Sequence, residues 1–374
     1  MNIEVNTVKF WEEDAVAHEE NCFSEKAKQV ALGIKMSDEC VFAELGVEGD
    51  PWGITSREKR IEYNKRYNDK AEKILGRRLL KEEYPTEDMI FPKIKRIGDV
   101  FGGRYERGEK TGEWLHGSVS TPDGLEKLLN QVDKLDLREF MLPDNWEQEK
   151  KRIYETYGLK PAPIRHIRGP VTHAMSIYGI ENLVYLGYDE PDLFARFSST
   201  ILRVILDMGK IMDVEAGYEI GKAPTGFSFA DDNCCLLTAD LYEQFGYPVL
   251  EGVFEYYCPG ENDRRYQHSD SEMDHLLPIL AKVNLTGCNF GPTVLVEEIR
   301  KYMPKTCIDG CLAPFTFMNN NTEDIIAEVK RDCEAIKRTK TRGLNVYTAG
   351  SINNGSSLES LKAVMLAICQ YGQY

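Results

Sequence analysis

Short β-prone runs alternate with longer amphipathic runs from about residue 160 to the C-terminus. The short runs predict strands at 162–167, 225–230, 264–269, 282–287, 305–310 and 344–350. The longer runs have apolar residues at helical spacing and predict helices at 190–212, 238–257, 271–283, 292–303, 322–339 and 356–372. Strands and helices in alternation are typical of a parallel sheet with crossover helices. The βα units of residues 155–374 therefore define the fold class.

The first 160 residues have a less regular pattern. The sequence predicts a strand at 39–46, a loop at 102–114 and a helix at 121–136. Within the charged segment 57–84 it predicts an exposed helix that ends near Gly76. Six βα units leave room for two more strands upstream, and eight close a barrel. We therefore expect an α/β fold, a (β/α)8 TIM barrel formed by residues 1–374 as a single domain, with a mostly helical N-terminal extension over residues 1–38.

Composition excludes several classes of partner. The 374 residues have a net charge of −15, which repels nucleic acid phosphates and anionic membranes. The sequence has no apolar run long enough for a membrane helix and no signal-peptide pattern at its start, so we expect a cytoplasmic protein. Ten cysteines without a CxxC pair are typical of reduced, buried thiols.

The expected barrel indicates where active-site residues should lie, because barrel enzymes have their active sites at the C-terminal ends of the strands. The polar residues that directly follow or end the predicted strands are Glu44, Arg168, Asp231, Asp232, His268, Ser269, Asp270, Asn289, Cys311, Ser351 and Asn353. His166 adds a second imidazole two residues before Arg168. Carboxylates, an imidazole, a thiol and amides would then face one cavity, so the sequence predicts an acidic mouth with candidate metal ligands.

Each of these residues also has a structural interpretation. His268 can be a hydrogen-bonded histidine at a strand end, and Asp270 can cap the helix that follows it. One of Asp231 and Asp232 can cap a turn, and Cys311 can be a small buried hydrophobe. Four more residues can either line the cavity or serve only the scaffold, namely Glu44, His166, Ser351 and Asn353.

Three segments resemble the uroporphyrinogen decarboxylase superfamily. They are PIRHIRGPVTHAMSIYGIENL, GFSFADDNCCLLTADLYEQFGYPVLEGV and GCLAPFTFMNNNTEDIIAEV, and their order along the chain matches the order in that superfamily. The resemblance runs from about residue 155 to the C-terminus and implies the (β/α)8 barrel. It also implies one of two chemistries, because the superfamily contains both decarboxylases and methyltransferases.

The decarboxylase branch fits this sequence poorly. Its members carry an arginine-rich segment after the first strand, and those guanidinium groups bind the many carboxylates of the substrate. The corresponding segment here reads FAELGVEGDPW, which is acidic, and the decarboxylase histidine after the last strand is replaced by AGSINNG. Decarboxylation of a porphyrinogen-like acid is therefore the alternative, and a non-catalytic barrel that acts as a scaffold is another.

The methyltransferase branch works with cobalamin-carrying corrinoid proteins, and some of its members bind zinc through a His-x-Cys pair and a distant Cys. Here His268 matches that histidine, but Asp270 replaces the cysteine and Ser351 stands near the place of the distant one. Zinc also accepts carboxylate oxygen, so His268 and Asp270, with Cys311 as a further candidate, form the predicted zinc site.

We therefore expect a corrinoid-dependent methyltransferase that moves a methyl group between a small ether or amine and cobalamin on a partner corrinoid protein. The predicted catalytic residues are His268, Asp231, Asp232 and Asp270. The predicted substrate-binding residues are Glu44, His166, Asn289, Ser351 and Asn353. The resemblance also implies a homodimer.

Overall fold

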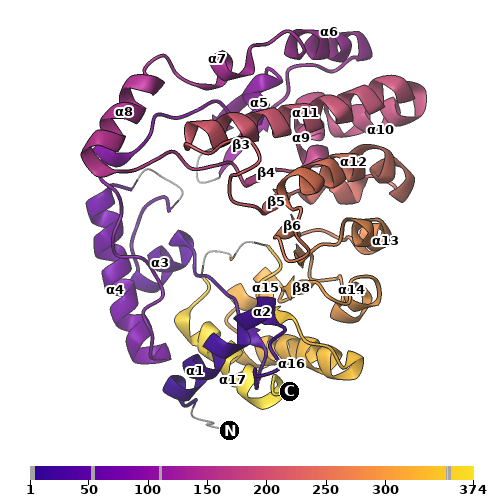
Figure 1. Ribbon diagram of the computed structural model, residues 1–374. Helices are drawn as coiled ribbons and strands as arrows, with labels where there is room; N and C mark the ends of the chain where they lie inside the picture. Colours follow the sequence, from indigo (N-terminus) through magenta and orange to yellow (C-terminus); the bar gives the residue numbers. More distant parts are fainter. Residues whose placement is uncertain (1–4, 52–54, 109–111, 351, 353–354) are drawn as a thin grey trace. The chain divides into compact units, whose positions relative to one another are not determined.

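The computed structural model describes residues 5–51, 55–108, 112–350, 352 and 355–374 (Figure 1). The chain divides into two compact units. Unit 1 consists of residues 1–84 and 268–374, and unit 2 consists of residues 85–267. The single domain expected over residues 1–374 stays a prediction.

Unit 1 begins with a mostly helical segment. Its elements are α1 (Thr7–Ala17), α2 (Glu19–Cys22), β1 (Ala31–Leu32), α3 (Asp38–Leu45) and α4 (Arg57–Leu75). Helix α4 begins after Ser56, whose hydroxyl accepts from the backbone N–H of Lys59, and ends at Gly76 in the left-handed conformation. The predicted end of this helix is thereby confirmed.

The second part of unit 1 is a series of short strands and helices. In chain order they are η3 (Asp274–Leu276), α13 (Leu277–Leu280), η4 (Ala281–Val283), β7 (Gly287–Phe290), α14 (Val296–Tyr302), β8 (Cys307–Asp309), α15 (Pro314–Met318), α16 (Thr322–Thr339), β9 (Leu344–Val346) and α17 (Leu358–Tyr371). The strands pair in parallel in the order β1-β9-β8-β7. Helices α16 and α17 pack against each other, as Figure 1 shows.

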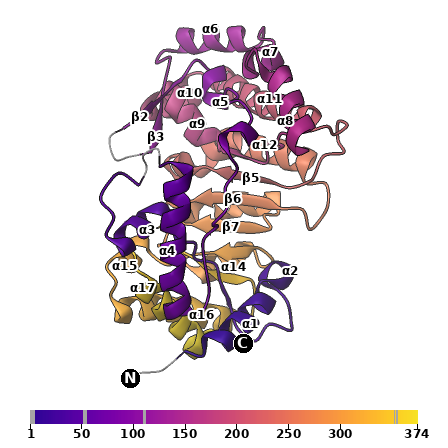
Figure 2. The ribbon, with the colours of Figure 1, turned by 90° about the vertical axis from the view of Figure 1, so that its left-hand side faces the viewer.

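Unit 2 contains the remaining elements. They are η1 (Glu87–Met89), α5 (Ile97–Val100), β2 (Arg104–Arg107), β3 (Glu113–His116), α6 (Pro122–Val132), α7 (Leu137–Met141), α8 (Trp146–Tyr157), β4 (His166–Arg168), α9 (Pro170–Tyr178), α10 (Ile180–Asp189), α11 (Pro191–Glu215), β5 (Phe227–Ala230), η2 (Asp232–Leu236) and α12 (Ala239–Tyr257). Strands β4 and β5 are parallel. Helices α11 and α12 pack against each other, and Figure 2 shows both ribbons. The rings of Phe194 and Phe197 on α11 contact that of Phe245 on α12, and burial of each ring stabilises the unit by about 2 kcal/mol.

Strand β6 (Arg265–Ser269) carries the chain from unit 2 into unit 1. In unit 2 its start lies beside β5, because the N–H of Phe227 donates to the carbonyl of Arg264. The α/β class and the parallel βα pattern predicted from the sequence are confirmed. The described residues contain seven strands of the parallel set, of the eight that a closed barrel needs.

Several predicted elements differ from the structure. Residues 39–46 were expected to form a strand but form α3, because Asp38 and Glu39 in the first turn and left-handed Gly46 after the last turn are helix-end signals. The loop expected at 102–114 contains the antiparallel pair β2–β3. The strand expected at 282–287 begins only at Gly287, because Asn284 takes the left-handed conformation and ends η4.

No helix among the described residues is long and apolar enough to cross a bilayer.

Candidate functional site

His268 lies on β6 and is fixed by the side chain of Asn289, which lies on β7. Its Nδ1 is 2.8 Å from Oδ1 of Asn289. Asn289 is 3% exposed, and its Nδ2 donates to the carbonyl oxygens of Asp309 at 2.5 Å and Thr348 at 3.1 Å. Its Oδ1 also accepts from the backbone N–H of Gly350 at 3.1 Å. The amide group therefore joins the end of β6 to the ends of β8 and β9.

These contacts assign the protonation of the His268 ring. Because Nδ2 of Asn289 donates to two carbonyl oxygens, the atom that faces His268 is the amide oxygen, which can only accept. Nδ1 of His268 must then carry a proton, which leaves Nε2 as the nitrogen that can bind a metal. In metal and acid–base sites, one ring nitrogen of a histidine usually donates to a protein acceptor. The other nitrogen then binds the metal or exchanges the proton.

Asp270 lies just after β6, with its carboxyl group close to the imidazole of His268. One ligand atom from each of the two side chains lies within 4.8 Å of the other. Gly350 allows this position of Asp270, since a Cβ on Gly350 would come within 2.6 Å of Asp270 Oδ2, and Gly350 also has a φ of +81°. The expected helix at 271–283 begins only at Asp274, and no side chain caps it. The N-cap residue of this first turn is Met273, so the capping role of Asp270 stays a prediction.

His268 and Asp270 fit a zinc ion. They offer one imidazole nitrogen and one carboxylate oxygen, both of which zinc accepts, and Asn289 supplies the hydrogen bond that orients the imidazole. Cys311, the third predicted ligand, is 1% exposed, and burial raises the pKa of its thiol well above the usual value. Among the described residues, Cys311 belongs to no group of metal-ligating side chains, so its prediction as a ligand gains no support.

Asp231, in unit 2, caps the N-terminus of helix α9. It is fully buried, and its carboxylate accepts from the N–H groups of Thr172 at 2.6 Å and Val171 at 3.4 Å. Gly169, at the N-cap position, has no side chain to do this, and a Cβ there would lie 2.2 Å from Asp231 Cβ. Burial raises the pKa of Asp231 to about 6, although the N–H donors oppose that rise. A catalytic role for Asp231 stays a prediction.

We predict that Asp231→Ala lowers the free energy of unfolding by about 2 kcal/mol or more, because two buried N–H groups lose their acceptor. Denaturant titration measures this change. The adjacent half-buried Asp232 is the matched control, and Asp232→Ala should change stability by less than about 1 kcal/mol. Equal losses of unfolding free energy in the two variants would contradict the capping role of Asp231.

Of two predicted substrate-binding residues, one lies where the sequence did not indicate and the other lies on a strand as expected. Glu44 was expected after a strand but lies on α3, where its carboxylate accepts from the N–H of Leu358 at 3.2 Å and lies 3.4 Å from Lys70 Nζ. His166, on β4, is exposed and hydrogen-bonded to Ser228 at 2.9 Å. Their roles toward a substrate stay predictions, as does that of Asn289. Ser351 and Asn353 lie outside the described residues.

Sequence reasoning missed the structural role of Gly350 and of the carbonyls of Asp309 and Thr348. Residues 348–350 were assigned to the end of the strand predicted at 344–350, and Gly350 was the signal available. Which residue this glycine faces depends on strand register, which a single sequence does not contain.

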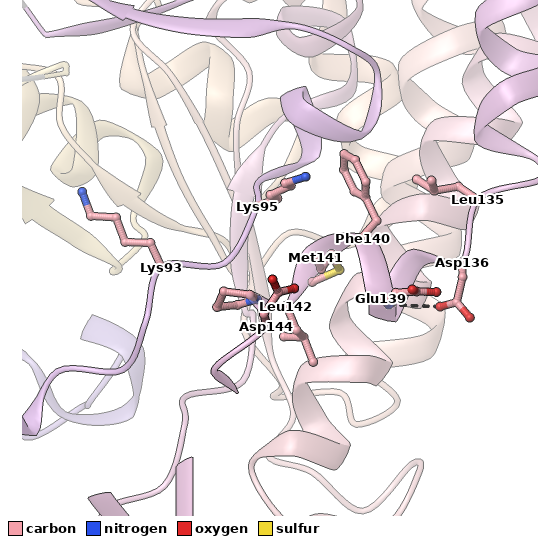
Figure 3. A pocket seen from close by; sticks show the side chains of 10 residues that line it. Lys93, Lys95, Leu135, Asp136, Glu139, Phe140, Met141, Leu142 and Asp144 are labelled. Carbon is pink, nitrogen blue, oxygen red and sulfur yellow. Dashed lines mark hydrogen bonds between the residues drawn. The ribbon is translucent and has the colours of Figure 1, made fainter. Parts of the chain in front are cut away.

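A separate surface pocket of about 540 Å³ lies in unit 2 (Figure 3). Lys93, Lys95, Glu139 and Phe140 are among the residues that line it, and the Lys95 ammonium lies 3.9 Å from the centre of the Phe140 ring. None of the residues predicted from the sequence to form the site lines this pocket.

Comparison with known proteins supports the fold. No family model and no curated protein matches the sequence. Among solved structures, the chain is similar to a methyltransferase from Methanosarcina mazei, with a TM-score of 0.56 and 16% sequence identity. The match covers 92% of this chain and 94% of that chain. Similarity at this level of identity shows a shared fold along nearly the whole length.

Proposed function

We propose that the protein is a corrinoid-dependent methyltransferase that moves a methyl group from a small ether or amine to the cobalamin of a partner corrinoid protein. The observation that carries the proposal is the His268 ring, whose Nδ1 donates to Asn289 and which has a ligand atom within 4.8 Å of the Asp270 carboxylate. The order of the superfamily-like segments and the fold shared with a methyltransferase support the choice of reaction. The homodimer belongs to the same proposal.

The chemistry requires activation of the leaving heteroatom. Cleavage of a methyl–oxygen bond transfers CH3 to the nucleophilic cobalt of cob(I)alamin, and the departing alkoxide takes up a proton to become an alcohol. A bound zinc ion would polarise that oxygen as a Lewis acid. His268 and Asp270 would hold the ion, and Asn289 keeps the imidazole in the tautomer that ligation requires.

Asp232, in unit 2, is a further proposed catalytic carboxylate. It follows β5 and begins η2, and two residues later Cys234 Sγ accepts from Gln267 Nε2 at 4.0 Å. The carboxylate of Asp232 would hold the proton that the leaving group receives.

The test is a spectroscopic assay with cob(I)alamin and a panel of methyl ethers and methylamines. The proposal predicts protein-dependent formation of methylcobalamin with at least one donor. Release of CO2 from a porphyrinogen-like acid without any methylation would favour the decarboxylase alternative. Absence of both activities, with no effect of His268 substitution on any property, would favour a scaffold.

Asp232→Asn is expected to lower the methylation rate about 100-fold or more while thermal stability stays within about 1 kcal/mol of wild type. The amide keeps the size of the side chain but loses the charge and the proton. The measurement is the initial rate under saturating donor, beside a thermal melt of the same preparation. Full activity in this variant would remove Asp232 from the site.

A further inference from the structure

Two cysteines far apart in the sequence pack against each other in unit 1. Cys22, at the end of α2, and Cys307, at the start of β8, belong to one small buried cluster with Ala17, Ala27 and Ala31. The Cys307 thiol also donates to Oδ1 of Asp309 at 3.9 Å. The three alanines leave the sulfur atoms as the largest polarisable groups of the cluster. Their chemistry is distinct from that of the site at His268.

The backbone holds Cys22 in this position. Glu20, Asn21 and Cys22 all have φ values between +52° and +66°, a run that L-residues rarely adopt. The Cys22 carbonyl accepts from the N–H of Gly343 at 2.9 Å, and the Asn21 side chain donates to the carbonyl of Thr286 at 2.7 Å. Contacts on both sides therefore compensate for the strained turn and direct Cys22 toward the base of β8.

The imidazole of His18 lies beside the Cys22 thiol, and the carboxylate of Asp14 lies beside that imidazole. His18 Nδ1 lies 4.0 Å from Cys22 Sγ, and its Nε2 lies 3.5 Å from Asp14 Oδ2 and 3.2 Å from the carbonyl oxygen of Leu32. Asp14 is buried and accepts from the N–H of Leu32 at 2.7 Å. The hydrogen bond to Asp14 raises the pKa of His18 to about 10, so the ring carries a positive charge beside the thiol at neutral pH.

The two thiols differ in acidity. The hydrogen bond from Cys307, with a smaller effect of His18, lowers the pKa of Cys22, whereas the same bond and burial raise the pKa of Cys307. Burial raises the pKa of several other cysteines, among them Cys258 and Cys333. Cys22 thus has the environment of a nucleophilic thiolate and Cys307 that of a resolving thiol.

We propose that Cys22 and Cys307 form a reversible disulfide when the protein meets hydrogen peroxide. The Cys22 thiolate attacks one peroxide oxygen, the O–O bond breaks, and the hydroxide that leaves takes a proton from His18 to become water. The Cys307 thiol then attacks the sulfenic sulfur of Cys22, an S–S bond forms, and a second water leaves. In sum, two thiols and one H2O2 give one disulfide and two waters, and an added dithiol reverses the change.

The bond would tie the N-terminal segment to β8. At the other end of β8, the carbonyl of Asp309 accepts from Asn289, which orients His268. Cross-linking residues so distant in the chain restricts the unfolded state strongly, so the oxidised protein should melt at a higher temperature than the reduced one.

The test uses the full-length protein, one equivalent of hydrogen peroxide, alkylation of the remaining thiols, and peptide mapping by mass spectrometry without reduction. Exposure alone would favour Cys235 and Cys369, which are the two cysteines that are not buried. The proposal predicts a linked peptide pair that contains Cys22 and Cys307, formed at least about tenfold faster than any product at Cys235 or Cys369. The linked pair should disappear after treatment with dithiothreitol.

Variants distinguish the nucleophilic role of Cys22 from the resolving role of Cys307. Cys307→Ser should leave Cys22 trapped as a sulfenic acid that a dione reagent labels, whereas Cys22→Ser should leave Cys307 as a free thiol. Cys333→Ser, at another buried cysteine, is the matched control and should not change the linkage. Oxidation confined to Cys235 and Cys369, or an unchanged product pattern in Cys22→Ser, would overturn the proposal. None of these outcomes depends on methyl transfer.

Discussion

His268→Ala is expected to abolish methylation of cob(I)alamin, with a rate at least about 1,000-fold below that of wild type. The substitution removes the imidazole close to the Asp270 carboxylate, together with any metal that the two side chains hold. The free energy of unfolding should fall by only about 1–2 kcal/mol, because the ring is half-buried and the change removes its hydrogen bond to Asn289 without leaving a large cavity. The measurement pairs initial rates with denaturant titration.

Two further variants serve as controls for this result. His275→Ala changes an exposed histidine seven positions along the chain and should leave both rate and stability unaltered. His268→Gln keeps a donor for Asn289 Oδ1 but has no imidazole, so it should fold like wild type and remain inactive. Unfolding of His268→Ala, with activity retained in His268→Gln, would show that the histidine is structural.

Asn289→Ala is expected to have the largest effect on stability, with a loss of about 3 kcal/mol or more. The substitution removes the acceptor of Gly350 N–H and of His268 Nδ1, and it removes the donors to the Asp309 and Thr348 carbonyls. Each buried polar group left without its partner costs about 1–3 kcal/mol. The imidazole also loses its orientation, so the affinity for zinc should fall about 10- to 100-fold.

The comparison for this variant is Asn345→Ala, on β9, which pairs with β8. The Asn345 side chain makes one resolved hydrogen bond, from its Nδ2 to Asp309 Oδ1 at 2.8 Å, and its Oδ1 has no partner. We expect a loss of about 1 kcal/mol and no change in zinc affinity, measured by urea titration and by titration calorimetry. Equal losses in the two variants would mean that Asn289 is an ordinary polar residue and not the centre of a network.

The sequence predicted helices best where the local signals were complete. Helix α16 was expected at residues 322–339 and forms over those residues, because its apolar spacing and its acidic first turn agree. The region 39–46 failed because its apolar pair, Val41 and Phe42, resembles a strand, whereas the flanking residues are helix-end signals. The short strands were located to within a few residues, since strand ends depend on pairing partners that lie elsewhere in the chain.

The candidate site was predicted only in part, and for a similar reason. His268 and Asp270 could be named from their position after a β-prone run, because barrel folds place functional groups there. The tautomer of His268 could not be predicted, since it depends on Asn289 and on carbonyls near residues 309 and 348. Asp231 was named for its charge, but its helix-capping contacts are made with Val171 and Thr172, which lie 60 and 59 positions earlier in the chain.

The measurement that tests the central claim most directly is a zinc titration of methyl transfer. Chelator-treated protein, cob(I)alamin and an active methyl donor are combined, and the initial rate of methylcobalamin formation is followed as zinc is added. The account predicts that the rate rises and saturates at one zinc per chain, and that His268→Ala shows no rise at any zinc concentration. A full rate without zinc, unchanged in His268→Ala, would contradict it.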